Sequence, residues 1–354
     1  MLKFKSLSLT ILCAVVISLA VTSCSKKEDF TNLGVVPVAN LENGLVFRKA
    51  SLKNQQVTFQ LFDDDGNEIL EDVTYYVDEN ALDNNTFLSD VEGTFEIYAR
   101  FLLNGEEVVT ETETFDVITP VKKVVVEDYT GTWCGYCPSV TAAIEEVLAQ
   151  TTHVSVVAIH NGDDLSLPIE PVIRDGLGIP DGSPRARIDR TIVWGTPSPA
   201  NFPVDEVLPY AGIPSNTSIA IQSNIQGGTI FATVTVASED VLEGRKLVLY
   251  LVEDGILRDQ TNYYNQDPDS PYFNMGDPIV NFEHNHTLRG NLSDVLGDAI
   301  PDTPALTDYV ADFSFSMDPE FVAENLHLVA MVVDSDNLAI NSQNALVGEE
   351  KPFE

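Results

Sequence analysis

Cys134 and Cys137 are the residues of this chain best placed for covalent chemistry. They are separated by two residues and follow a valine-rich run, residues 121–126, that contains two lysines and is typical of a strand. Apolar residues after Cys137 recur at helical spacing, which places both thiols at a helix N-terminus. Unpaired backbone N–H groups and the positive end of the helix dipole favour a thiolate there, and the thiolate is the nucleophile. The second thiol can resolve a mixed disulfide, so the spacing predicts thiol–disulfide exchange.

The other cysteines leave two alternatives open. The chain has four cysteines, of which Cys13 lies in an apolar N-terminal stretch and Cys24 ends a run of small residues. A secreted scaffold held by disulfides would carry more cysteines at wider spacings. The pair could instead form a small structural disulfide or half of a zinc site. No second C-x-x-C motif and no nearby histidine pair completes a tetrahedral metal site, so no metal is expected.

The N-terminus predicts export and a lipid anchor. Two lysines precede an apolar run, residues 7–21, which is short for a membrane span and fits a signal peptide. The small residues before Cys24 resemble a bacterial lipoprotein signal, in which the cysteine carries the lipid. Ser25 then implies the outer membrane, and residues 26–29 resemble surface-export tags or form a solvated tether. An ordinary signal peptide with a chance cysteine is the alternative.

The charge of the chain excludes one class of partner. The formal net charge is −36 over 354 residues, and residues 1–23 hold two lysines and no acid, so the chain from Cys24 onward carries −38. Such a surface repels phosphates, which makes nucleic-acid binding improbable. The acids are scattered, which favours a solvated surface over a disordered acidic tail. No phosphate loop or dinucleotide fingerprint is present, so no cofactor is expected.

Two β-rich regions flank the cysteine pair. Residues 30–118 are short alternating runs separated by turn residues, which predicts an immunoglobulin-like sandwich. Within this region, residues 63–68 resemble a calcium loop but lack EF-hand spacing, so a hairpin turn is expected. Residues 216–354 return to strand patterns around a long insertion, residues 254–307, and predict a second sandwich.

The segment between these regions predicts a strand–helix–strand unit. Residues 121–128 and 153–159 are expected strands, and residues 138–150 are the helix that connects them. A right-handed connection places Cys134 at the carboxyl edge of the first strand, where such folds bind ligands. A short helix is expected near residues 171–177 and another at 201–210.

The residues from Val124 to Pro138 resemble the active-site segment of the thioredoxin superfamily. Their Cys-Gly-Tyr-Cys core is similar to that of periplasmic disulfide isomerases. Together with the lipoprotein signal, the β-rich regions and the segment 284–290, the chain resembles the 28-kilodalton outer membrane protein family, lipoproteins with a thioredoxin-like domain. The resemblance implies a mixed β and α/β fold class with four parts: a signal peptide (1–23), an immunoglobulin-like β domain (24–118), a thioredoxin-like α/β domain (119–212) and a C-terminal β-sandwich (213–354).

The resemblance also implies roles for residues around the pair. Cys134 would be the attacking thiolate and Cys137 the resolving thiol. Asp128 occupies the position of a buried carboxylate that moves the proton of the resolving cysteine, and burial would raise its pKa toward the working pH. An ordinary acid at the end of the strand, Asp128 or Glu127, is the alternative. Trp133 would shield the site and offer an apolar docking surface.

The fold implied by the resemblance also places a cis-proline opposite the cysteines. Pro184 is the candidate because a strand pattern follows it at once, and Pro180 is the competitor. Ser183 would then present its backbone to an extended substrate chain. Gly135 and Tyr136 replace the usual Gly-Pro between the cysteines, and the final hairpin and helix of a thioredoxin are hard to recognise after residue 194.

Three histidines are weaker candidates. His160 ends the second strand of the strand–helix–strand unit and could approach the cysteines, although a satisfied polar strand end is the simpler interpretation. His284 and His286 are spaced for one face of a strand. No third ligand is evident, so a structural pair is preferred to a metal site.

Two functions compete. The first is a lipid-anchored thiol–disulfide oxidoreductase or isomerase whose partners are thiols or disulfides of envelope or extracellular proteins. The second is an outer-membrane binding or structural lipoprotein in which the cysteine pair is only a structural disulfide. Both have the membrane as a partner through the N-terminal lipid.

Overall fold

The computed structural model describes residues 44–63, 65–103, 105–195 and 203–354. The expected signal peptide and the expected lipid attachment residue, Cys24, lie outside these residues. Residues 201 and 202 of the expected helix 201–210 also lie outside them, and the rest of that segment forms two 3-10 turns, η2 (Val204–Glu206) and η3 (Leu208–Tyr210).

Residues 44–118 are built from short strands. One sheet has the order β2 (Ala50–Leu52), β10 (Glu113–Ile118), β8 (Gly93–Leu103), β5 (Val73–Val77) and β6 (Asn80–Ala81), with β9 (Glu106–Val109) paired to β8. Two small ladders join β1 (Leu45–Val46) to β4 (Gln60–Leu61) and β3 (Val57–Thr58) to β7 (Thr86–Phe87). Phe47, Phe59 and Phe115 pack together in the core. The carboxylate of Asp63 accepts the backbone N–H groups of Asp65 and Asn67, which closes a turn.

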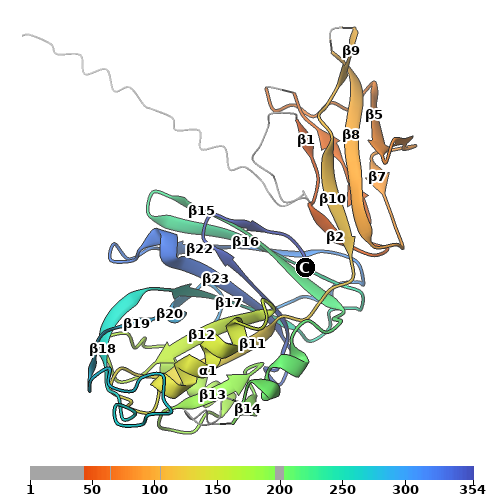
Figure 1. Ribbon diagram of the computed structural model, residues 1–354. Helices are drawn as coiled ribbons and strands as arrows, with labels where there is room; N and C mark the ends of the chain where they lie inside the picture. Colours follow the sequence, from red (N-terminus) through yellow and green to blue (C-terminus); the bar gives the residue numbers. More distant parts are fainter. Residues whose placement is uncertain (1–43, 64, 104, 196–202) are drawn as a thin grey trace, which may run out of the picture. The chain divides into compact units, whose positions relative to one another are not determined.

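The remaining strands are centred on a nine-stranded sheet (Figure 1). Its order is β14 (Ile192–Trp194), β13 (Arg185–Ile188), β11 (Val124–Thr130), β12 (Val154–His160), β20 (Thr287–Asn291), β17 (Lys246–Glu253), β23 (Leu326–Val333) and β24 (Ala339–Leu346), with β21 (Asp298–Ala299) paired to β17. β12 is parallel to β11 on one side and meets β20 on the other, where Ala158 pairs with Thr287. All seven residues of β11 and of β12 are buried, which agrees with the mainly apolar sequence of β12 and requires partners or neutralisation for the two acids of β11.

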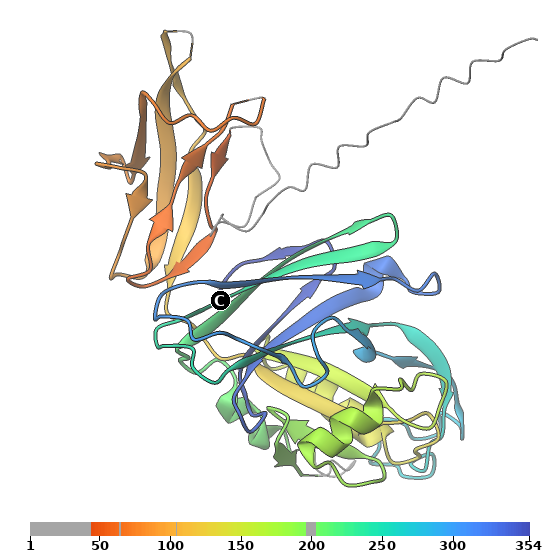
Figure 2. The ribbon, with the colours of Figure 1, turned by 180° about the vertical axis from the view of Figure 1, so that it is seen from behind.

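Different layers cover the two faces of this sheet. On one face, Val124 and Val126 pack against Val140 and Ile144 of α1 (Pro138–Leu148), which follows β11. The same face of β17 and β23 packs on a four-stranded sheet of β22 (Tyr309–Ser316), β16 (Thr229–Ser238), β15 (Thr217–Gln226) and β25 (Glu350–Lys351). The opposite face packs on α2 (Glu170–Leu177) through Ile173, and Figure 2 shows α2 on the side away from α1. A separate ladder joins β18 (Ile256–Gln260) to β19 (Ile279–His284) within the expected insertion.

The expected fold class is wrong. The described residues contain twenty-five strands and two α-helices, so the structure is mostly β. The strands expected to form a thioredoxin-like α/β domain, β11 to β14, share one sheet with β17, β20, β21, β23 and β24 from the expected C-terminal sandwich. The physical reason is the free edge of β12, which is closed by β20 through parallel pairing. The boundaries expected at residues 118 and 212 stay predictions.

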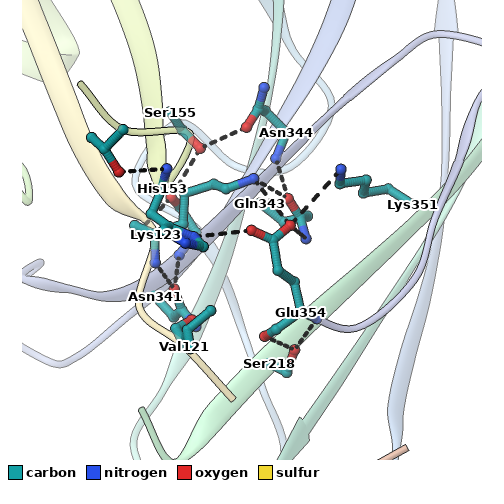
Figure 3. Close-up of polar contacts among 12 residues, drawn as sticks. Val121, Lys123, His153, Ser155, Ser218, Asn341, Gln343, Asn344, Lys351 and Glu354 are labelled. Carbon is teal, nitrogen blue, oxygen red and sulfur yellow. Dashed lines mark hydrogen bonds and ion pairs between the residues drawn. The ribbon is translucent and has the colours of Figure 1, made fainter. Parts of the chain in front are cut away.

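A buried polar network supports the edge strand β24 (Figure 3). Asn341 accepts the backbone N–H of Lys123 and donates to the carbonyl of Val121. The ammonium of Lys123 donates to Gln343 and pairs with Glu354 at 3.4 Å. Burial lowers the pKa of Lys123. The network explains how a strand with a polar run, Asn341 to Asn344, can be buried.

A buried ion pair joins β11 to the turn after β13. The carboxylate of Glu127 lies 3.1 Å from the guanidinium of Arg190, and both side chains are fully buried. Tyr129 donates its hydroxyl to the same carboxylate, and Arg190 donates to the hydroxyl of Tyr250 on β17. The ion pair therefore connects three segments of the nine-stranded sheet.

Glu127→Ala should lower the free energy of unfolding by about 3–5 kcal/mol, because it leaves the buried charge of Arg190 without a partner. Chemical denaturation of both proteins at the same pH measures the loss. Glu146→Ala, at an exposed position of α1, is the control and should change stability little. A loss below about 1 kcal/mol for Glu127→Ala, in the range of a surface ion pair, would contradict this account of the pair.

Candidate functional site

The cysteine pair lies where β11 passes into α1. Cys134 and Cys137 form a disulfide with their Cα atoms 5.4 Å apart. The carbonyl of Cys137 accepts the backbone N–H groups of Val140 and Thr141, so Cys137 caps the helix. Cys134 is 3 % exposed and Cys137 is 1 % exposed. The strand-to-helix position agrees with the sequence, but the pair is covered rather than open to solvent.

Residues 260–263, here called the cap, bond to the backbone around the pair. The side-chain amide of Gln260 donates to the carbonyl of Cys134 at 3.0 Å. Two backbone N–H groups of the cap, from Thr261 and Tyr263, donate to the carbonyls of Thr132 and Gly135, each at 2.9 Å. These bonds attach the cap to the loop that carries the disulfide.

Gly135 allows the cap to approach this closely. A Cβ atom at this position would lie 2.4 Å from the ring of Tyr263, so any larger residue would displace that ring. The ring of Tyr136 meets the ring of Tyr263 edge-on, with centroids 5.0 Å apart. The residues between the two cysteines are therefore fitted to the cap.

The shielding and docking role expected of Trp133 stays a prediction. Its side chain is 45 % exposed, and its indole N–H donates to the carbonyl of Asn161 at 2.7 Å. Gln260 and Tyr263 pack on the loop that carries the pair. Trp133, Tyr136 and Tyr263 leave exposed aromatic surface around the covered pair.

Asp128 is buried on the face of β11 that packs against α1. Its residue is 3 % exposed, and its Oδ1 atom has no hydrogen-bond partner among the described residues. Burial raises the pKa of Asp128 to about 8. The neighbouring acid, Glu127, points to the opposite face and pairs with Arg190. Asp128 is therefore the carboxyl that can hold a proton near neutral pH.

The peptide bond between Ser183 and Pro184 is cis, as predicted, whereas Pro180 is not one of the cis prolines of the described residues. β13 begins at the next residue and is antiparallel to β11, with Ala186 opposite Asp128. Arg174 of α2 donates to the carbonyl of Pro180 and holds the preceding loop. The Oγ atom of Ser183 is buried without a partner. The role of Ser183 toward a substrate chain stays a prediction.

His160 is a satisfied strand end, and it also orders the loop beside the disulfide. Its Nδ1 atom lies 2.8 Å from the carboxylate of Asp163, which accepts the backbone N–H of Thr132 as well. Burial alone would raise the pKa of Asp163, but the hydrogen bond and charge of His160 outweigh it and lower the pKa to about 2.

His284 and His286 do not share one strand face. The ring of His284, at the end of β19, packs edge-on against His160 at 5.1 Å, whereas His286 pairs with Asp254 at 3.2 Å. Within the ranges that the structure describes, no group of three or more histidine, cysteine or acidic residues could hold a metal ion. The structural role preferred for these histidines stays a prediction.

Sequence reasoning missed the cap. Gln260 and Tyr263 lie in the expected insertion 254–307, more than a hundred residues from the cysteines, and no spacing pattern links the two segments. The glycine between the cysteines was the available signal, because it marks a close approach of another chain segment. Arg190 was missed for the same reason, since nothing in its sequence neighbourhood points to Glu127.

Asp128→Asn should change how stability depends on pH. The carboxyl ionises near 3.8 when it is free and near 8 in the folded protein, so between these pH values the folded state holds the extra proton. The free energy of unfolding of the wild type then falls as the pH rises from about 4 to about 8, by roughly 5 kcal/mol from this group alone.

The asparagine variant lacks this group, so it should gain stability relative to the wild type across the same interval. Denaturant unfolding at pH 5 and pH 8 measures the gain, and Asp175→Asn at an exposed position of α2 controls for the loss of a carboxylate. An equal difference between variant and wild type at both pH values would rule out the raised pKa.

Comparisons with known proteins bear on both fold and family. HBP35 of Porphyromonas gingivalis has a similar structure, with a TM-score of 0.53 and 21 % sequence identity over 66 % of this chain and 77 % of that chain. A domain of the outer membrane lipoprotein Omp28 from the same organism aligns with 38 % of this chain and 97 % of that chain at 19 % identity, with a TM-score of 0.24 that is too low to support a conclusion. No curated relative matches the chain. The likeness to HBP35 concerns the fold alone.

The described part of the chain has no helix with the length and apolar character needed to cross a membrane. The model of the family described as outer membrane protein Omp28 matches residues 180–351. That stretch contains β13, the cap, both histidines of the segment 284–290 and most of the nine-stranded sheet. Over this stretch the chain is similar to the Omp28 family of outer membrane proteins.

Proposed function

We propose that this chain is a lipid-anchored outer-membrane protein that works as a binding or structural protein, and that Cys134–Cys137 is a structural disulfide. The match of residues 180–351 to a family of outer membrane proteins supports the location. The small residues before Cys24 support a lipid on that residue. The observation that carries the proposal is the burial of both cysteines beneath the cap.

The burial matters because exchange requires direct attack. A thiolate must reach one sulfur of the disulfide before the bond can break. Both cysteines are almost completely covered, and Gln260, Thr261 and Tyr263 bond to the backbone around them. Hydrogen bonds of this kind contribute about 1 kcal/mol each, so three of them hold the cap closed by about 3 kcal/mol. The closed cap therefore protects the disulfide.

Opening the cap should expose the disulfide to reductants. In Gln260→Ala and in Tyr263→Ala, we expect the rate of reduction by dithiothreitol to rise about fivefold. The first variant removes one hydrogen bond of about 1 kcal/mol, and the second removes the ring that packs on Gly135 and Tyr136. Alkylation of the released thiols at timed intervals, followed by mass spectrometry, measures the rate. Tyr210→Ala, an exposed tyrosine outside the cap, is the matched control. Reduction of the wild type as fast as of the two cap variants would overturn the proposal.

Thiol–disulfide exchange is the second candidate, and Asp128 favours it. A structural disulfide that closes so small a ring stabilises the folded chain by only about 2 kcal/mol. Burying the unpaired Asp128 costs free energy, and a role in proton transfer would account for this cost.

In the exchange, a partner thiolate attacks Cys134, the Cys134–Cys137 bond breaks, and Cys137 leaves and takes the proton of Asp128. A second partner thiolate then displaces Cys134. The partner dithiol is oxidised to a disulfide and the pair is reduced.

Trapping separates the two candidates. In Cys137→Ala, the remaining thiol of Cys134 would attack a partner disulfide and stay bound to it, because the resolving thiol is gone. Mixed disulfides recovered from envelope extracts on non-reducing gels, and absent with the double variant Cys134→Ala and Cys137→Ala, would favour exchange. A folded Cys137→Ala protein that captures nothing would favour the structural disulfide.

A further inference from the structure

A small cavity separates Asp128 from His284. It has a volume of about 30 Å³ and is lined by residues of β11, α1, β12 and β19, by Gln260 at the end of β18, and by Asn285 and His286 after β19. Asp128 and His284 line its buried part, and Glu145 and Glu283, which are exposed, also line it. A water molecule needs roughly 10–15 Å³ of such space, so the cavity has room for one or two.

Two buried polar atoms at this cavity have no partner. They are Oδ1 of Asp128 and Nε2 of His284. The two residues are 3 % and 6 % exposed. An unsatisfied buried polar atom costs about 1–3 kcal/mol, and in native structures such atoms are usually bridged by ordered water. A cavity that is polar, large enough for water and lined by two unpartnered atoms fits this pattern.

The charges around the cavity suit transfer of a proton. Burial and the neighbouring His160 lower the pKa of His284 to about 4, so its ring is neutral at pH 7 and can accept and release a proton. The other titratable groups facing these residues come from each packed element: Glu145 from α1, His160 and Asp163 at the end of β12, Glu283 and His286 around β19, and Arg258 and Asp164 near the ladder. The buried end thus holds two neutral groups, and the exposed end holds carboxylates.

We propose that this cavity is a water-filled proton path in which His284 and enclosed water connect the carboxyl of Asp128 with solvent near Glu145 and Glu283. The proton leaves Asp128 for the adjacent water, and that water gives a proton to Nε2 of His284 or to the next water outward. Only O–H and N–H bonds form and break, so no oxidant or reductant is needed. The path holds whether the disulfide is structural or exchanges, because it concerns the carboxyl and not the thiols.

Isotope exchange at Asp128 tests the path. The C=O stretch of its protonated carboxyl is identified by infrared difference between the full-length wild type and Asp128→Asn, and its shift after transfer to D₂O at pH 6 gives the exchange rate. His284→Phe removes Nε2 and fills the space that water would use, and it should slow the exchange at least about tenfold through the loss of a buried hydrogen-bond partner. His153→Gln, a histidine that does not line the cavity, should exchange like the wild type.

Three outcomes would overturn the path. The first is exchange as fast in folded His284→Phe as in the wild type. The second is a wild-type carboxyl that exchanges only as slowly as the protein unfolds globally. If His284→Phe does not fold, the same measurement is made on His284→Gln. The third outcome is an exchange rate in that variant equal to the wild-type rate. None of these results depends on the rate of disulfide reduction, so the path and the proposed function can fail separately.

Discussion

The fold around the site depends on burying two consecutive carboxylates in one strand. β11 is covered on both faces, and its side chains alternate, so Glu127 and Asp128 enter opposite layers. A buried charge must be paired or neutralised. Glu127 is paired with Arg190, which ties β11 to β17 through Tyr250. Asp128 has no cation, and burial keeps it protonated near neutral pH. The strand thus meets one constraint in two different ways.

Asp128 and the disulfide lie in one region, which is bounded by α1 and by the segment from β18 to β19. α1 follows Cys137 and forms one wall of the cavity beside Asp128. The segment from β18 to β19 supplies both the cap over the disulfide and His284 at the cavity. One insertion therefore packs beside both the disulfide and the buried carboxyl. This arrangement explains why the insertion packs on the strand–helix unit although it lies far away in sequence.

The sequence is informative where structure is decided locally. The strand that precedes the cysteines, the helix that follows Cys137 and the cis bond before Pro184 are each indicated by neighbouring residues, and the structure contains them. The expected fold class is wrong because sheet membership depends on distant pairing. β12 pairs with β20 at a single register position, Ala158 with Thr287. The hydrophobic periodicity of the two strands does not predict this pairing. The cap was missed for the same reason.

The candidate site was predictable to a similar extent. Cys134 and Cys137 were identified from their types and spacing, and Asp128 from the resemblance to thioredoxins. The structure places the first two in a disulfide and the third in a buried, unpaired position. Their accessibility was not predictable, because it depends on Gln260 and Tyr263 from another part of the chain. The spacing of the cysteines thus predicts thiol chemistry, but it does not predict the contact with Gln260 and Tyr263 that limits access to the pair.

The reduction potential of the Cys134–Cys137 pair tests the central claim most directly. Equilibration of the full chain with glutathione buffers, followed by alkylation and mass analysis, gives the value. A structural disulfide predicts a potential below about −300 mV, at which the glutathione pool does not reduce the pair. A value between about −120 and −270 mV, in the range of catalytic dithiols, would contradict the structural account and favour exchange.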